Sequence, residues 1–343
     1  RSEHKYGRGV GCASLVHASG SRAGDPEFPG DSAVLQCAYD GTLTVWAGES
    51  EFGQGAKTVM AQVVAEEFGV SPDSVIVQLG DTRLTPFATG THGSKLTTIL
   101  ANAVLAACDN AKKEILDEIT LMTGSGKLHI EGGTVKNGRG DELMTLAEAL
   151  NKVCIKRSGA PVIALGEYRP AAVMLDPTGY GNLAPTYPFG VQAAEVEVEE
   201  STGRILVKKI VSVHDSGKIF NPQMAAGGVY GGVTQAFGFT MMEQLGINDQ
   251  GLLHGGTFLE YKMPTMLDVP ELAADFVETV DPHGPYGAKA LGEPPIVSVL
   301  PAIANAVYHA TGLRLDDAPF TPQKVLKAIQ KQKMSKKKDG AGL

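Results

Sequence analysis

The chain has 343 residues, 43% of them hydrophobic and 20% charged, which excludes disordered, collagen-like and small disulfide-framework proteins. A formal net charge of −8 argues against a nucleic-acid-binding protein. The four cysteines lie too far apart for a metal-ligand motif, so we expect neither an iron–sulfur nor a zinc site built by this chain alone. Without a bilayer-length apolar run or a signal-peptide core, the sequence predicts a cytoplasmic location and free thiols.

Hydrophobic periodicity in the first half predicts short strands that alternate with helices. The strongest helix is the one at 95–120, where apolar residues from Leu96 to Ile115 keep the 3.6-residue period. We expect strands at 33–39, 42–47 and 74–79, helices at 54–68, 95–120 and 143–153, and a hairpin near 127–136.

A stretch rich in proline and glycine at 169–188 is the best candidate for a boundary between two lobes. After it we expect strands at 191–199, 205–213 and 272–280, and helices at 223–245, 295–311 and 322–333. Strands and helices mix without a βαβ rhythm, so the fold class is α+β with mixed sheets and packed helices. The predicted division is a first lobe at 1–175, a second lobe at 176–330 and a flexible basic tail at 331–343.

Common catalytic and nucleotide-binding motifs do not match this chain. Gly126-Lys127 lacks the first glycine and the Ser or Thr of a phosphate-binding loop, and the glycines at 7–11 have the wrong spacing for a dinucleotide fold. The eight histidines form no HExxH pair, and no GxSxG elbow is present.

Three glycine-containing segments interrupt apolar surroundings at 51–58, 89–97 and 287–295. The first two each lead into a predicted helix, so free backbone N–H groups there could hold an anion such as a phosphate. When each segment is taken alone, ordinary N-capping by Ser or Thr is the better explanation. In the third segment, Glu293 precedes a Pro-Pro pair and could be either a general base held among apolar groups or a stabiliser of the helix start.

Taken together, these segments resemble the second molybdenum-cofactor-binding half of the xanthine dehydrogenase and aldehyde oxidase family, over about residues 6–329. The matching residues are, in chain order, Gly53-Gln54-Gly55, Thr58, Gln62, Ala65-Glu66, Asp81-Thr82, Gly90 to Lys95, Phe189-Gly190, Glu195, Glu197, Asp215, Gly217, Asn221-Pro222, Tyr261 to Pro264 and Gly292 to Pro295. Many matches in the right order make an accidental resemblance improbable.

The resemblance implies a molybdopterin cofactor, for which the cytosine dinucleotide form is one candidate, and a catalytic carboxylate at Glu293. That carboxylate would take a proton from the oxygen that attacks an electron-poor carbon of the substrate. No side chain is expected to ligate the metal, although the backbone of Gly93 would come close to it. The implied cofactor-binding residues are Phe52, Gly53, Gln54, Gly55, Thr91, His92, Gly93 and Ser94.

The chain departs from the family pattern at Gly227-Gly228, where a Gly-Gln pair is usual, and at Tyr230, which replaces a frequent Glu. The first molybdenum-binding half and the iron–sulfur and flavin parts are not in these 343 residues. By resemblance to split enzymes such as nicotinate dehydrogenase, the expected partners are a complementary molybdenum subunit, a [2Fe-2S] subunit and a subunit with FAD. Such a chain would be an oxidoreductase subunit that is active only with its partners.

The leading interpretation is a molybdenum hydroxylase that oxidises an aromatic or N-heterocyclic substrate, with water as the oxygen source. A second interpretation rests on the similarity of 17–22 and 86–95 to hydroxybenzoyl-CoA reductase, in which Glu293 would deliver a proton during reductive dehydroxylation. A non-catalytic assembly subunit is a third, which the presence of both Glu293 and Gln54 disfavours. The pocket walls would come largely from the missing half, so the sequence does not name the substrate or the electron acceptor.

Overall fold

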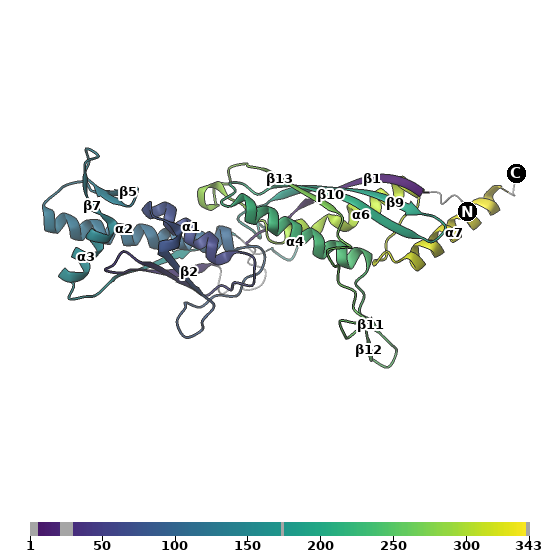
Figure 1. The fold of residues 1–343 in the computed structure, drawn as a ribbon, viewed down its shortest axis with the longest axis horizontal. Helices are drawn as coiled ribbons and strands as arrows, with labels where there is room; N and C mark the ends of the chain where they lie inside the picture. The colour runs from purple at the N-terminus through teal and green to yellow at the C-terminus, as the bar shows by residue number, and fades with distance from the viewer. Residues whose placement is uncertain (1–5, 21–29, 173–174, 341–343) are drawn as a thin grey trace.

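The computed structural model describes residues 6–20, 30–172 and 175–340. It has two lobes that follow each other along the long axis of the molecule (Figure 1). Each lobe contains a four-stranded mixed sheet and its own hydrophobic core. The fold is therefore α+β, as the sequence predicts.

The first lobe is built on a sheet with the strand order β4-β3-β2-β8. Its strands are β2 (Asp31–Cys37), β3 (Leu43–Ala47), β4 (Val75–Leu79) and β8 (Val162–Tyr168). One face packs against α1 (Ala56–Phe68) and against α2 (Ala101–Thr123), which a π-helical turn, η2 (Leu96–Leu100), precedes. A short 3-10 helix η1 (Pro72–Ser74), the helix α3 (Leu146–Lys156) and a small sheet of β5 (His129–Glu131), β6 (Thr134–Lys136) and β7 (Glu142–Thr145) complete the lobe.

Alternation of apolar and polar residues explains how the first sheet buries one face. Leu35 of β2 and Val45 of β3 point into the core and are almost fully buried, whereas their chain neighbours are partly exposed. The apolar series predicted for 95–120 covers this face as η2 and α2. The prediction missed β8, whose Gly166 lies so close to α2 that a Cβ atom would stand 2.1 Å from the carbonyl oxygen of Ala103.

The second lobe has the sheet order β1-β9-β10-β13. Its strands are β1 (Tyr6–Val16), β9 (Phe189–Glu199), β10 (Arg204–Asp215) and β13 (Glu271–Val277). Helix α6 (Val299–Thr311) packs on β1 and β9, and α4 (Pro222–Met241) packs on β13, α6 and the short α5 (Pro294–Val297). A hairpin of β11 (Gly246–Ile247) and β12 (Leu253–His254) extends from the body, and η3 (Pro285–Gly287) precedes the Glu293 segment.

The first strand belongs to the second sheet, because β1 pairs with β9 along its whole length. Glycine makes this packing possible: a Cβ atom on Gly9 or Gly11 would stand 2.1 Å from backbone atoms of Ala306 in α6. The strand at 6–16 therefore lies in the second lobe, whereas the prediction placed all of 1–175 in the first lobe. A lobe boundary near residue 175 stays a prediction.

The last helix, α7 (Pro322–Gly340), includes most of the predicted basic tail at 331–343. Its Lys333 pairs with Glu200 in the turn between β9 and β10, with 2.9 Å between amine and carboxylate. Residues 341–343 lie outside the described part of the chain, and the flexibility of this tail stays a prediction. Among the described residues, none of the helices combines the length and the apolar character needed to cross a membrane.

Candidate functional site

The loop before α1 carries the first group of predicted cofactor-binding residues. Gly53 and Gly55 both have positive φ, and Gly55 is the residue from which α1 begins. The carboxylate of Glu51 accepts hydrogen bonds from the backbone N–H groups of Gly53, Gly55 and Lys57, at 2.7, 3.2 and 3.0 Å. The backbone donors that the sequence left free for an anion are therefore already bound by a side chain of the same loop.

Burial alone would raise the pKa of Glu51, but the three backbone donors lower it below its ordinary value. The loop is thus held by a charged acceptor at a helix N-terminus. Phe52 stands out from this loop with 69% of its surface exposed. The Gln54 side chain turns back on the loop, since its amide nitrogen donates to Ser50 O at 2.8 Å and its oxygen accepts from Phe52 N at 2.8 Å.

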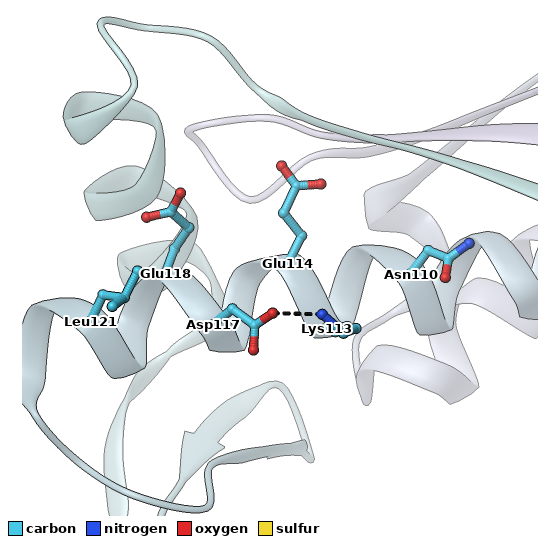
Figure 2. A pocket seen from close by; sticks show the side chains of 6 residues that line it. All are labelled: Asn110, Lys113, Glu114, Asp117, Glu118 and Leu121. Atoms are coloured by element: carbon cyan, nitrogen blue, oxygen red, sulfur yellow. Dashed lines mark hydrogen bonds and ion pairs between the residues drawn. The ribbon is translucent and has the colours of Figure 1, made fainter.

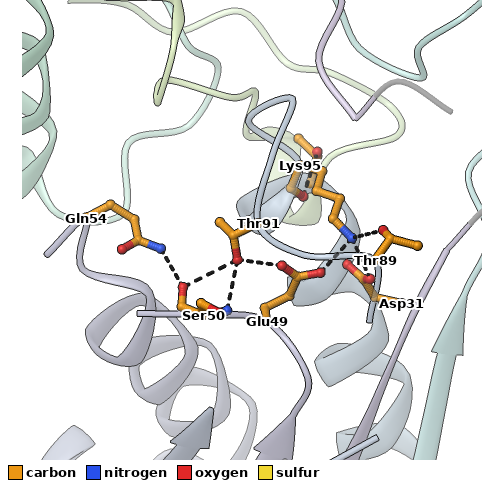
Figure 3. Close-up of polar contacts among 8 residues, drawn as sticks. Asp31, Glu49, Ser50, Gln54, Thr89, Thr91 and Lys95 are labelled. Carbon is orange, nitrogen blue, oxygen red and sulfur yellow. Dashed lines mark hydrogen bonds and ion pairs between the residues drawn. The ribbon is translucent and has the colours of Figure 1, made fainter. Parts of the chain in front are cut away.

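Thr91 links the second predicted segment to the first. Its hydroxyl donates to Glu49 Oε2 at 2.5 Å and accepts from the backbone N–H of Ser50 at 2.9 Å (Figure 3). The next residue, His92, is exposed. Gly93 has positive φ, and its carbonyl accepts a hydrogen bond from Gly20 N at 2.8 Å. The structure therefore brings the turns at 50–55 and 91–94 together.

A buried charged cluster stands behind this pair of turns, and we call Asp31, Glu49, Thr89 and Lys95 the Lys95 cluster (Figure 3). The ammonium of Lys95 lies 2.9 Å from Asp31 Oδ1, 2.6 Å from Glu49 Oε1 and 3.2 Å from the Thr89 hydroxyl. All three charged side chains are at least 93% buried. Two carboxylates share one ammonium, so the cluster carries a net negative charge when all three groups are ionised.

Burial raises the pKa of Asp31 to about 6, against the attraction of Lys95, and Glu49 adds to the increase. The second carboxylate oxygen of Asp31 has no hydrogen-bond partner, which fits a site that can take up a proton. Burial alone would lower the pKa of Lys95, but the two carboxylates raise it above its ordinary value. The ammonium therefore stays charged at neutral pH.

The side chain of Glu293, from the second lobe, contacts Ser94 of the first lobe. The Ser94 hydroxyl donates to Glu293 Oε2 at 2.7 Å and accepts from the Glu293 backbone N–H at 2.8 Å. Ser94 has positive φ, which is uncommon for a residue with a Cβ atom and marks a specialised turn. His17 lies on the same side, with Nε2 3.4 Å from Glu293 Oε2.

Glu293 precedes the four-residue helix α5, and its side chain makes no capping hydrogen bond there. The carboxylate therefore does not cap this helix through a hydrogen bond. The carboxylate is half exposed, at 50%, and its neighbours are Ser94 and His17. The expectation of a carboxylate held among apolar groups is therefore wrong, because polar side chains from the other lobe and from the end of β1 meet it.

A neutral buried network lies behind the Glu293 turn, and we call Gln192, Ser212, His214 and Ser298 the Gln192 cluster. Gln192 accepts from the Ser298 hydroxyl at 2.7 Å and donates to Ser212 Oγ at 2.8 Å and to the carbonyl of Pro295 at 2.7 Å. His214 Nε2 lies 2.8 Å from Ser212 Oγ. These contacts fix the residues that follow Glu293 to β9 and β10.

Sequence reasoning missed His17 as a neighbour of Glu293, and it missed the Gln192 cluster. Gln192 had a recognisable signal: it occupies the inward parity of β9, shared with Ala194, Val196 and Val198, where a polar residue needs a buried partner. His17 had none, since 17–20 follows a strand whose pairing was not predicted. The similarity noted for 17–22 falls partly on Ser21 and Arg22, outside the described residues.

Helix α4 begins beside the first turn, since a Cβ atom on Gly55 would stand 2.0 Å from Met224 Cε. Gly227 and Gly228, which differ from the family pattern, have open space where a Cβ atom would be, and Tyr230 is 39% exposed. The departure therefore leaves an unfilled surface on α4.

A separate shallow hollow lies along the C-terminal half of α2 (Figure 2). It is lined by Asn110, Lys113, Glu114, Asp117, Glu118 and Leu121. The turn at 91–94 precedes the opposite end of this helix, so the hollow is not part of the Glu293 site. Within the described ranges, no group of three or more His, Cys, Asp or Glu side chains could hold a metal ion.

The two-lobed fold and the meeting of these turns agree with comparison to known proteins. Residues 1–270 match the family model described as the molybdopterin cofactor-binding domain. The chain belongs to this family, which is the molybdopterin-binding domain of the xanthine dehydrogenase, aldehyde oxidase and CO dehydrogenase enzymes.

Among its relatives is the putative xanthine dehydrogenase molybdenum-binding subunit of Escherichia coli K12, 34% identical over 329 residues. That match covers 93% of this chain and 41% of the relative. The nicotine 6-hydroxylase large subunit of Paenarthrobacter nicotinovorans is 29% identical over 96% of this chain and 41% of its own length. Reconstituted CO dehydrogenase from Oligotropha carboxidovorans has a TM-score of 0.83 at 25% identity, over 98% of this chain and 42% of that one. The chain spans less than half the length of these relatives.

The site residues fit a polar cofactor of this kind. Gly53 and Gly90 have positive φ, and a Cβ atom on either would meet nothing within 4 Å, so a ligand can approach their backbone closely. Gln54, Thr91 and Ser94 offer neutral hydrogen-bonding groups beside it. No protein ligand for a metal is needed, because the pterin would carry the metal.

Proposed function

We propose that this chain is the part of a heteromeric molybdenum hydroxylase that supplies half of the cofactor pocket and the catalytic base Glu293. The observation that carries the proposal is the hydrogen-bonded contact between Ser94, in a predicted cofactor-binding turn, and Glu293, 199 positions away in the chain. The relatives' names support a substrate that is an N-heterocycle or an aldehyde. The remaining parts would be a complementary molybdenum subunit, a [2Fe-2S] subunit and one with FAD, in the cytoplasm.

A molybdenum cofactor, when bound, supplies the two-electron redox chemistry. Phe52, Gly53, Gln54 and Gly55 would hold one side of it, and the turn at 91–94 would hold another, with the backbone of Gly93 close to the metal. Gln54 would exchange its bonds within the loop for bonds to the cofactor. We also propose the cytosine dinucleotide form.

The Oε1 atom of Glu293 would accept the proton of the reacting hydroxyl. No hydrogen bond to this atom is recorded among the described residues, whereas Oε2 is held by Ser94. One oxygen thus fixes the orientation of the carboxylate, and the other stays available to a substrate or a reacting water. Positioned acid–base groups of this kind contribute about 10²–10⁴-fold to rate.

The decisive variant is Glu293→Gln in the assembled enzyme purified with its partner chains. The amide keeps the volume and can still accept from Ser94, but it cannot take up a proton. Turnover should fall about 10²–10⁴-fold with molybdenum content unchanged. The assay follows dye reduction with xanthine, nicotine and benzaldehyde as probes. Glu271→Gln is the matched control, because Glu271 is a surface carboxylate paired with Lys209.

An unchanged rate in metal-replete Glu293→Gln would refute the role of Glu293. A reductive dehydroxylation of an aromatic thioester, carried out by the wild type that fails every oxidative assay, would favour the hydroxyaryl-CoA reductase alternative. If Glu293→Gln keeps both its turnover and its molybdenum content, as the Glu271→Gln control does, the non-catalytic assembly subunit is favoured.

A further inference from the structure

The two oxygens of Glu293 lie in different surroundings. Oε2 accepts from the Ser94 hydroxyl at 2.7 Å and lies 3.4 Å from His17 Nε2, whereas no hydrogen bond to Oε1 is recorded within the described ranges. The single hydroxyl proton of Ser94 is directed at Oε2, and its oxygen already accepts from the Glu293 N–H. Ser94 cannot keep a proton from the carboxyl group, because a neutral hydroxyl is a far weaker base than an imidazole.

His17 is the ionisable group that contacts this carboxylate among the residues the structure describes. Lys95 is not an alternative, because its ammonium is engaged by Asp31 and Glu49 in the buried cluster. A base that accepts a proton in each turnover must lose that proton before the next one. The geometry leaves His17 as the acceptor.

We propose that His17 relays the proton from Glu293 to solvent, a role that rests on the proposed function of Glu293 as the base. In this step the carboxyl group turns about its Cγ–Cδ bond so that the oxygen that took up the proton faces His17 in place of Oε2. The O–H bond then breaks, and the Nε2 lone pair of His17 takes the proton. The carboxylate is restored and an imidazolium forms. The imidazolium then loses this Nε2 proton to a water that reaches the ring, since the His17 side chain is 19% accessible.

The imidazole is oriented for this role by its own segment. His17 Nδ1 lies 2.8 Å from the hydroxyl of Ser19, which is fully buried. Backbone bonds from His17 N to Pro188 O and from Ser19 N to Thr186 O, both 3.1 Å, fix the segment to the strand-like stretch before β9. With the ring proton on Nδ1, the imidazole can donate to Ser19 and presents the Nε2 lone pair to Glu293.

The same segment also contacts the predicted cofactor turn, because Gly20 N donates to Gly93 O at 2.8 Å. His17 thus belongs to the second sheet through β1 and to the site through Gly93 and Glu293. Backbone contacts on both sides set its position, so the contact between His17 and the carboxylate is a fixed feature of the fold.

Chemical rescue tests the relay in the assembled enzyme. His17→Ala should lower kcat for steady-state substrate oxidation at least ~10-fold with little change in KM, and added imidazole should restore much of the loss. The first turnover should stay fast, because the relay acts only between turnovers. His17→Gln places an amide near the position of Nε2 but has no basic nitrogen. It should be as slow as the alanine variant and should not respond to imidazole.

Full activity in His17→Ala would overturn the relay. Full activity in His17→Gln but not in His17→Ala would overturn it too, because a hydrogen bond without proton transfer would then suffice. These failures differ from failure of the proposed function. If Glu293→Gln retains its rate, the base itself is wrong. If Glu293→Gln is slow while both His17 variants are fast, only the relay is wrong.

A second measurement uses the full chain without cofactor. Nitrogen-15 labelling of histidine and two-bond proton–nitrogen spectra report which ring nitrogen carries the proton. The His17 signals, identified by their loss in His17→Gln, should shift in Glu293→Gln. His309 lies on α6, and its Nδ1 atom accepts a hydrogen bond from Val10 N at 3.0 Å. Its signals should not shift and serve as the control. Unchanged His17 signals in Glu293→Gln would overturn the coupling, and far-ultraviolet circular dichroism confirms that each variant is folded.

Discussion

The two lobes hold their halves of the site with opposite chemistry. In the first lobe, the Lys95 cluster anchors the Thr91 turn through charged groups, since Glu49 binds both Lys95 and the Thr91 hydroxyl. In the second lobe, the Gln192 cluster anchors the Glu293 turn through an amide and hydroxyl groups. Both clusters are buried, so the difference concerns charge and not exposure.

A buried charged anchor depends on protonation, whereas a neutral one does not. The Lys95 cluster has one ammonium for two carboxylates, and burial raises the pKa of Asp31 to about 6. Burial lowers the pKa of His214 in the Gln192 cluster to about 4, so this histidine is neutral at pH 7. The stability that the Lys95 cluster gives to the cofactor side should therefore change in mild acid, and the stability that the Gln192 cluster gives to the Glu293 turn should not.

Removing the ammonium is expected to have the largest effect on stability. Lys95→Met keeps most of the apolar stem but leaves Asp31 and Glu49 facing each other without a cation. Breaking a buried ion pair in this way costs about 3–5 kcal/mol in the free energy of unfolding. Urea denaturation at pH 7 measures it.

Lys113→Met is the matched control, because Lys113 makes an exposed pair with Asp117 one helical turn away. Its loss should change the unfolding free energy by less than about 0.5 kcal/mol. Equal effects of the two lysine variants would contradict the role assigned to the Lys95 cluster.

The pH dependence of stability should show the charged anchor next. A carboxyl with a pKa raised from 3.8 to about 6 binds its proton more tightly in the folded state. The unfolding free energy therefore falls as pH rises from about 4 to about 6, by at most about 3 kcal/mol from this group. In Asp31→Asn that fall should be missing when urea unfolding is repeated across the window. Parallel curves for wild type and variant would show that Asp31 does not titrate there.

The neutral anchor gives the smallest of the three effects. Gln192→Leu leaves the Ser298 hydroxyl and the Pro295 carbonyl buried without their partner, which should cost about 2 kcal/mol. Because no charge is lost, this cost should be the same at pH 5 and pH 7. Gln36→Leu, on the open face of the first sheet, should change stability by less than about 0.5 kcal/mol. A pH-dependent effect of Gln192→Leu would remove the contrast between the anchors.

Regular periodicity made most helices predictable from sequence, as Leu96, Ile99 and Leu100 illustrate at the start of the helix predicted for 95–120. All three are buried, Leu96 and Leu100 in the core of the first lobe. Strands that rely on glycine were not predictable, because Gly9, Gly11 and Gly166 leave no apolar alternation and gain their place from close contact with a helix.

The site was predictable only as separate segments. Residue patterns singled out the turns at 51–58 and 89–97 and the residue Glu293, and the family resemblance joined them. The sequence did not reveal that the Glu51 carboxylate accepts hydrogen bonds from the backbone N–H groups at the start of α1, because that contact depends on the path of the loop before the helix. Nor did it bring His17 to Glu293, since the pairing of β1 decides where residue 17 lies.

The place of β1 also bears on how the chain acquires its structure during synthesis. Residues 30–172 can collapse on their own core as they leave the ribosome, because every strand of the first sheet lies within them. The strand at 6–16 emerges earlier but waits for Phe189–Glu199 before it gains a partner. Until then its backbone edges are unpaired and open to other chains, so this strand is an aggregation-prone segment of the nascent protein.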